Sequence, residues 1–142
     1  MASEKTHRGT CFCKAVEIEV TGEPATMVFC HCDSCRSWLS APVHGAALFP
    51  SAKVKVLRGE LGTTKRTQAS HRQFCTECGG RVMVLHPAIG MTDVPSVVLP
   101  DLAFRPTLHV HYGEKVIAMR DGLPKFKDFP KEFGGSGDVV PE

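Results

Sequence analysis

The sequence predicts an all-β fold of short strands that ends in an irregular segment, and two observations support this prediction. Several short segments alternate apolar and polar side chains with the period of two that is typical of half-buried strands. No window long enough for an ordinary helix keeps an apolar period of about 3.6 residues, so long helices are not expected. With 142 residues the chain has the length of one domain and can bury a hydrophobic core without metals or disulfides.

The first predicted strand covers residues 11–20, where valines and an isoleucine alternate with glutamates, and a Thr-Gly-Glu-Pro turn ends it. A second extended segment covers residues 27–32. It leads into a short helical turn that Asp33 or Ser34 is suited to cap and that ends before Pro42. The cysteine-rich part of the chain therefore alternates extended segments with tight turns.

Further short apolar segments predict the remaining strands. They cover residues 43–49, 53–58, 71–75, 81–86, 95–99 and 107–112. Residues 59–62 begin and end with glycine and are predicted to form a hairpin connection. From residue 121 onward prolines, glycines and lysines alternate with phenylalanines, which predicts an irregular C-terminal arm that packs its aromatic rings on the domain and is mobile at its end.

Charge and hydropathy limit the classes of partner. Seventeen Lys and Arg residues against 15 Asp and Glu give a formal charge of +2, and the basic residues are scattered. Neither nucleic acid nor a membrane is therefore expected as the main partner. No apolar run approaches the length of a membrane span, and the first residues lack the apolar core of a signal peptide. We expect a cytoplasmic protein, whose oligomeric state the sequence leaves open.

Seven cysteines are the most informative feature of the composition. An odd number of cysteines without an export signal argues against a disulfide framework. The cysteines fall into three groups, Cys11 and Cys13, then Cys30, Cys32 and Cys35, then Cys75 and Cys78. Grouping of this kind is typical of metal ligation.

Each group has a spacing that suits zinc. On an extended segment residues i and i+2 face the same way, which would place Cys11 beside Cys13 and Cys30 beside Cys32. The spacing Cys75-x-x-Cys78 is that of a zinc knuckle, and the two glycines that follow allow a sharp turn.

Structural zinc takes four protein ligands, whereas catalytic zinc takes three and keeps one position open. We therefore predict two zinc ions per chain. Cys11, Cys13, Cys75 and Cys78 would form a closed structural site, and Cys30, Cys32 and Cys35 an open, exchangeable site where chemistry occurs. In the alternative interpretation both sites are structural, with His31 or His44 as the eighth ligand. His31 lies between two ligands of an extended segment, so its side chain is expected on the opposite face.

Four stretches of sequence also carry a resemblance to a known family. They are Gly9-x-Cys11-x-Cys13-x-x-Val16, then Cys30-His31-Cys32-x-x-Cys35-Arg36 with Ala41-Pro42, then Arg72-x-Phe74-Cys75-x-x-Cys78-Gly79, and finally Phe104-x-Pro106-x-x-His109-Val110. This succession resembles the glutathione-dependent formaldehyde-activating enzyme family, whose domain is shared with centromere protein V. The resemblance covers residues 7 to about 112, and all seven cysteines match in order and spacing. It implies a zinc domain over residues 7–120, followed by the arm of residues 121–142.

The resemblance implies a β-tent of antiparallel sheets and the same division of the cysteines into structural and active-site zinc ligands. It also implies an activity, the addition of glutathione to formaldehyde, which is classed with carbon-sulfur lyases for the reverse direction. The expected protein is thus similar to an S-(hydroxymethyl)glutathione synthase, with a small thiol and an aldehyde as substrates. The proton donor would be His44 or water. Arg36 and Arg72 could pair with the carboxylates of the peptide, although solvated arginines are the simpler interpretation.

Two other classes of function stay open at this point. A non-catalytic zinc module would show neither affinity for a thiol nor rate enhancement. A glutathione carrier would bind the thiol without turnover.

Overall fold

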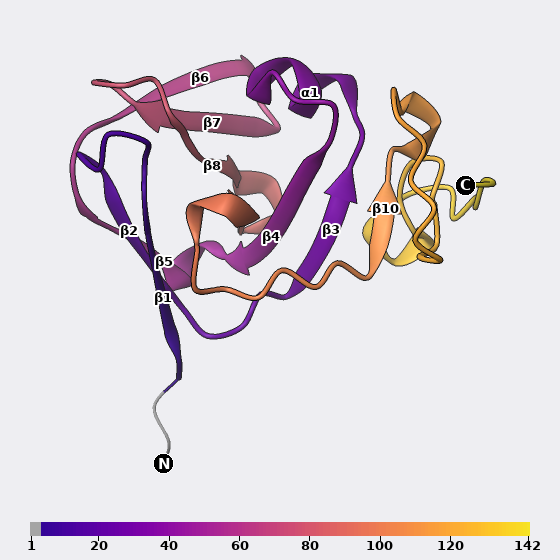
Figure 1. The fold of residues 1–142 in the computed structure, drawn as a ribbon, viewed down its shortest axis with the longest axis horizontal. Coiled ribbons are helices and arrows are strands. Elements are labelled where there is room, and N and C mark those ends of the chain that lie inside the picture. The colour runs from indigo at the N-terminus through magenta and orange to yellow at the C-terminus, as the bar shows by residue number, and fades with distance from the viewer. Residues whose placement is uncertain (1–3) are drawn as a thin grey trace. The chain divides into compact units, whose positions relative to one another are not determined.

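The computed structural model describes residues 4–142, and its chain forms two compact units. The first unit comprises the described residues up to Thr26 together with Ala47–Phe104, and the second comprises Met27–Ala46 and Arg105–Glu142. Strands predominate in the chain (Figure 1), as the period-two segments predicted. Within residues 4–142 no helix is long and apolar enough to cross a membrane.

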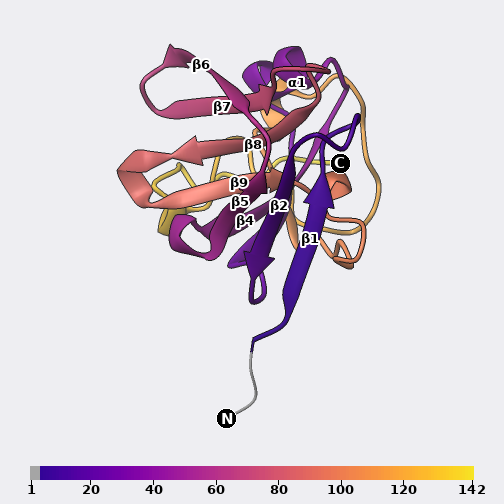
Figure 2. The ribbon, with the colours of Figure 1, turned by 90° about the vertical axis from the view of Figure 1, so that its left-hand side faces the viewer.

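A three-stranded antiparallel sheet lies in the first unit and has the order β1-β2-β5. Its strands are β1 (Thr6–Thr10), β2 (Glu17–Thr21) and β5 (Val54–Arg58), and Figure 2 shows β1 and β2 side by side. Alternation within β2 buries Ile18 and Val20 completely and leaves the glutamates half-buried. The hydrophobic effect of this face holds the segment as a strand.

Four further strands of the first unit are neighbours in the order β9-β8-β7-β6. They are β6 (Leu61–Thr67), β7 (Ser70–Cys75), β8 (Arg81–His86) and β9 (Met91–Pro95), and consecutive strands pair antiparallel. Val82 on β8 and Val94 on β9 are completely buried. The tight turn between β7 and β8 presents two of the cysteines.

The second unit contains the parallel pair β3 (Thr26–Cys30) and β10 (Leu108–Val110). It also contains α1 (Asp33–Leu39) and the beginning of β4 (His44–Pro50). The irregular arm runs beside β10 through backbone hydrogen bonds, among them those that join His109 with Pro124 and Phe126 (Figure 1). Among the described residues 4–142, five single turns of 3-10 helix lie at Ser51–Lys53, Pro87–Ile89, Ser96–Val98, Tyr112–Glu114 and Lys131–Phe133.

The predicted all-β fold is confirmed, and the one α-helix in the part of the chain that the structure describes has seven residues. The segments predicted as strands at residues 81–86 and 107–112 do contain strands. The boundary predicted at residue 120 and the mobility of the arm's end stay predictions. Arg105–Glu142 cluster with Met27–Ala46 in one unit.

Three local predictions are wrong. Residues 11–15 form a turn rather than a strand, because Lys14 takes a left-handed conformation with φ of 69° and its N–H bonds to the Cys11 carbonyl. Residues 59–62 are not a hairpin, because β5 pairs with β2 whereas β6 pairs with β7. Residues 95–99 contain a 3-10 turn, in which the Leu99 N–H donates to the Ser96 carbonyl, and this turn buries Val98 while leaving Val97 exposed. The sequence also missed strands β1, β6 and β9.

Candidate metal centres

The first cysteine cluster is built by two turns of the first unit. Cys11 and Cys13 lie on the turn between β1 and β2. Cys75 ends β7, and Cys78 lies on the turn to β8, which closes through a hydrogen bond from the Gly79 N–H to the Cys75 carbonyl. Gly79 has a φ of 73°, a left-handed conformation that glycine adopts without strain. Two segments about 60 residues apart are thereby brought to one point, as the spacing predicted.

The sulfur positions of this cluster fit zinc. All four Sγ atoms lie within 4.8 Å of one another. The Cys11 and Cys13 sulfurs are 3.7 Å apart, and the Cys13 and Cys75 sulfurs are 3.8 Å apart. A tetrahedron with zinc-sulfur bonds of about 2.3 Å has edges of about 3.8 Å, whereas a disulfide bond is about 2.05 Å long. The geometry is therefore that of a four-thiolate metal centre and not that of a disulfide.

Backbone N–H groups donate hydrogen bonds to three of the four sulfurs, those of Cys11, Cys75 and Cys78. The N–H groups of Val16, Glu77 and Gly80 each donate a hydrogen bond of 3.3 Å to a cysteine sulfur. Hydrogen bonds from the backbone of Gly80 and then of Cys13 lower the pKa of Cys78 to about 6. A thiol that ionises below neutral pH is ready to bind a cation.

The second cysteine cluster lies on one short segment of the second unit. Cys30 ends β3, Cys32 is the N-cap of α1 and Cys35 lies in the first helical turn. Their three Sγ atoms also lie within 4.8 Å of one another. The backbone N–H of Cys35 donates a hydrogen bond of 3.3 Å to the Cys32 sulfur. The prediction that Asp33 or Ser34 caps this helix is wrong, because a cysteine takes that position and uses it to orient its sulfur.

Hydrogen bonds among these three thiols separate their acidities. Contacts with the Cys32 and Cys35 thiols, followed by burial, raise the pKa of Cys30. The hydrogen bonds from Cys30 and Cys35 lower the pKa of Cys32 to about 2. The segment thus favours negative charge at Cys32, at the beginning of the helix.

Arg36 holds the segment that carries the second cluster. Its Nε donates a hydrogen bond of 2.9 Å to the His31 carbonyl, and its Nη2 donates one of 3.1 Å to the Glu114 carbonyl. The Glu114 carboxylate in turn accepts a hydrogen bond of 3.1 Å from the backbone N–H of Asp33. Arg36 is therefore more than a solvated side chain, because two of its nitrogens bind the backbone on either side of the cluster. The other candidate, Arg72, lies on β7 in the first unit.

Neither histidine considered as an eighth ligand belongs to a metal-binding group found among residues 4–142. His44 is buried at the start of β4. His31 is completely buried, and its Nε2 lies 2.8 Å from Nδ1 of His109. The sequence predicted that His31 would not act as a ligand but missed its partner, because no local pattern relates residues that are 78 positions apart.

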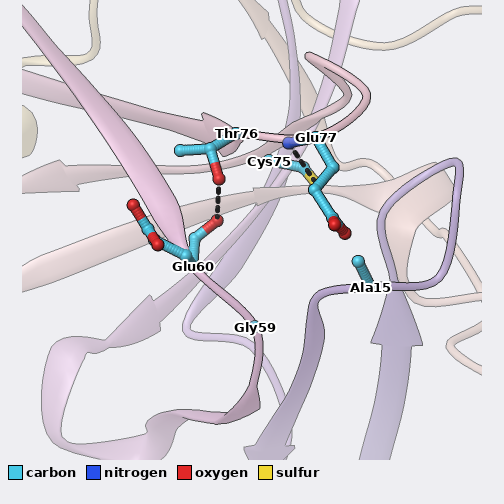
Figure 3. Close-up of a pocket in the computed structure, with 6 residues that line it drawn as sticks. All are labelled: Ala15, Gly59, Glu60, Cys75, Thr76 and Glu77. Carbon is cyan, nitrogen blue, oxygen red and sulfur yellow. Dashed lines mark hydrogen bonds between the residues drawn. The ribbon is translucent and has the colours of Figure 1, made fainter.

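A small pocket adjoins the first cluster (Figure 3) and has a volume of about 230 Å³. Cys75, Thr76 and Glu77 line it from the end of β7, and Ala15, Gly59 and Glu60 complete its lining. The Thr76 hydroxyl donates a hydrogen bond of 3.4 Å to the Glu60 carbonyl. Its cysteine belongs to the four-thiol cluster, and all its lining residues lie in the first unit.

Comparison with known proteins identifies the class of this domain. Residues 6–114 match the sequence profile of the family described as glutathione-dependent formaldehyde-activating enzyme. The match covers more than half of the chain and includes all seven cysteines. The chain therefore belongs to this family, as its motifs indicated.

Individual relatives agree with this assignment. An uncharacterized lyase of Schizosaccharomyces pombe is 32% identical over 74 residues, which are 51% of this chain and 53% of that protein. The chain thus spans about half the length of this curated relative. The crystal structure of a Rhodobacter sphaeroides protein is similar with a TM-score of 0.53 and 26% identity, and the match covers 68% of this chain and 90% of that one.

Proposed function

We propose that this chain is a zinc-dependent carbon-sulfur lyase of the glutathione-dependent formaldehyde-activating type, which adds glutathione to formaldehyde or another small aldehyde. One observation carries the proposal. The seven thiols divide into a group of four and a group of three, and each group gathers its sulfurs within 4.8 Å. Three thiolates leave one position of a tetrahedral zinc for a further ligand, which is the arrangement of catalytic zinc.

Zinc held by Cys30, Cys32 and Cys35 would keep an incoming thiol ionised at neutral pH. The segment itself supplies the ligands at low cost, because six consecutive residues carry all three sulfurs and Arg36 fixes their backbone. The low pKa of Cys32 favours the ionised form that binds a cation. The role of this segment would therefore be to hold one zinc ion that keeps a coordination position open for a thiolate.

The reaction joins the glutathione sulfur to the aldehyde carbon. The carbonyl electron pair moves to oxygen, and the proton released by the thiol is returned to that oxygen. Holding both reactants together supplies several kcal/mol of the barrier when their geometry is good. His44 and water remain the candidate proton donors, and His44 is buried in the same unit as the three thiols.

A steady-state assay tests the proposal. The zinc-loaded full chain should form S-(hydroxymethyl)glutathione faster than glutathione and formaldehyde do alone, and Cys32→Ser should abolish the increase. Ser34→Ala is the matched control, because Ser34 lies exposed on the same helical turn and should leave the rate unchanged. Binding of glutathione without acceleration would support a carrier instead. Neither binding nor acceleration would support a non-catalytic zinc module.

A further inference from the structure

Two completely buried histidines and the more exposed Asp121 form a continuous series of hydrogen-bonded side chains in the second unit. His31 Nε2 lies 2.8 Å from His109 Nδ1, and His109 Nε2 lies 2.7 Å from Oδ2 of Asp121. Both imidazole rings are completely buried and stacked with their centroids 5.1 Å apart, and the Tyr112 ring meets each of them edge-on. This series of hydrogen bonds begins at His31, between two cysteines of the second cluster, and ends at Asp121 in the irregular arm.

We propose that Asp121 is a positioning residue for the three-cysteine cluster, and that it acts through His109 on the ring of His31. This inference rests on the proposed metal site at Cys30, Cys32 and Cys35. It goes beyond the family assignment, because Asp121 lies outside the matched residues 6–114.

The carboxylate determines the tautomers of both rings. An ionised carboxylate only accepts hydrogen bonds, so Nε2 of His109 must carry a proton. In a neutral His109 ring Nδ1 is then an acceptor, and Nε2 of His31 donates to it. The Nδ1 of a neutral His31 is consequently unprotonated, which agrees with its burial without a hydrogen-bond partner.

Other groups of the arm fix the carboxylate itself. The Lys125 ammonium is completely buried and donates to Asp121, to the Leu123 carbonyl at 2.9 Å and to the Glu142 carboxylate at 2.7 Å. Glu142 also accepts hydrogen bonds from the backbone N–H groups of Asp121 and Gly122. Although burial raises it, the pKa of Asp121 is lowered overall by the hydrogen bonds from Lys125 and His109. The carboxylate is thus ionised and held from both sides.

The fixed position of His31 limits where the neighbouring cysteines can lie. The His31 N–H donates a hydrogen bond of 3.1 Å to the Val110 carbonyl, and its own carbonyl accepts the hydrogen bond from Arg36. With its ring fixed as well, His31 has few conformations available to it. Its two neighbours in the sequence, Cys30 and Cys32, are therefore held where their sulfurs converge. Outer groups that orient metal ligands typically change metal affinity by about 10- to 100-fold.

The test compares Asp121→Ala and Asp121→Asn with Asp128→Ala in the full chain. Asp128 is the matched control, because its carboxylate binds Phe129 and Ser136 in the same arm and is not part of the histidine chain. Zn²⁺ affinity of the second cluster is measured by competition with a chelator while the first cluster stays loaded. The histidine tautomers are assigned from the ¹⁵N resonances of the rings.

Asp121→Ala should weaken Zn²⁺ binding at the second cluster by about tenfold or more and should change the tautomer of His109. Asp121→Asn should show a smaller loss, because its amide oxygen can still accept a hydrogen bond, and Asp128→Ala should change neither property. An affinity within twofold of the wild type, or an equal loss in Asp128→Ala, would overturn the proposal. Failure of the wild type to act on glutathione and formaldehyde would refute the proposed function but would leave these two measurements valid.

Discussion

Removing one cysteine from each cluster should destabilise the protein to different extents. Cys75→Ser breaks a link between segments that are 62 positions apart, the separation of Cys13 and Cys75. Cys32→Ser breaks a link within a segment whose outer cysteines, Cys30 and Cys35, are only five positions apart. Loop-closure entropy scales as (3/2)RT ln n, so the ratio of 62 to 5 corresponds to about 2 kcal/mol. Zinc bound at the first cluster should therefore contribute about 2 kcal/mol more to the free energy of unfolding.

Thermal melts of the zinc-loaded variants measure this difference. For a chain of this size about 2 kcal/mol corresponds to a Tm difference of about 8 °C, with Cys75→Ser the lower. The same two variants in excess chelator are the control, because the difference should disappear when neither cluster holds metal. Equal Tm values with zinc, or a lower Tm for Cys32→Ser, would refute the division into a long-range and a local cluster.

Three further results are expected. Elemental analysis of protein purified without chelator should approach two zinc ions per chain, and seven freely titratable thiols in the native protein would contradict both sites. Gly9→Ala should cost about 3 kcal/mol or more in a denaturant titration, because its Cβ would lie 1.7 Å from the Val98 carbonyl oxygen. Gly90→Ala, whose Cβ meets open space at a φ of +64°, should cost only about 1 kcal/mol. Because the folded-state pKa of Asp121 is lowered, its contribution is present above the ordinary value of 3.8 and is lost as the pH falls through the folded value. The stability advantage of the wild type over Asp121→Asn should therefore shrink by about 1 kcal/mol between pH 6 and pH 2, and a pH-independent difference would argue against the ion pair.

The sequence was most informative where one local pattern decides the structure. The alternation in β2, the Cys75-x-x-Cys78 spacing and the glycine after it each depend on near neighbours in the chain, and each prediction agrees with the structure. The place of Cys11 and Cys13 was less predictable. Their sulfurs meet as expected but from a turn, because the left-handed Lys14 ends the extended run that the alternation suggested.

Contacts between distant residues explain what the sequence could not predict. The His31 ring depends on His109 and through it on Asp121, and no periodicity or motif connects the three positions. Likewise, the two glycines of residues 59–62 indicated a hairpin. The strands on either side, β5 and β6, pair instead with β2 and β7. Pairing partners that are remote in the chain are chosen by packing, which a local pattern does not record.

Spectroscopy of the cobalt-substituted full chain tests most directly whether the second cluster holds a metal that accepts a thiol. Glutathione should increase the thiolate-to-cobalt charge-transfer absorption, because a further sulfur ligand joins those of Cys30, Cys32 and Cys35. S-methylglutathione keeps the peptide contacts but cannot form a thiolate, so it should leave the absorption unchanged. The same response to both ligands, no response to glutathione, or a full response in Cys32→Ser would contradict the account.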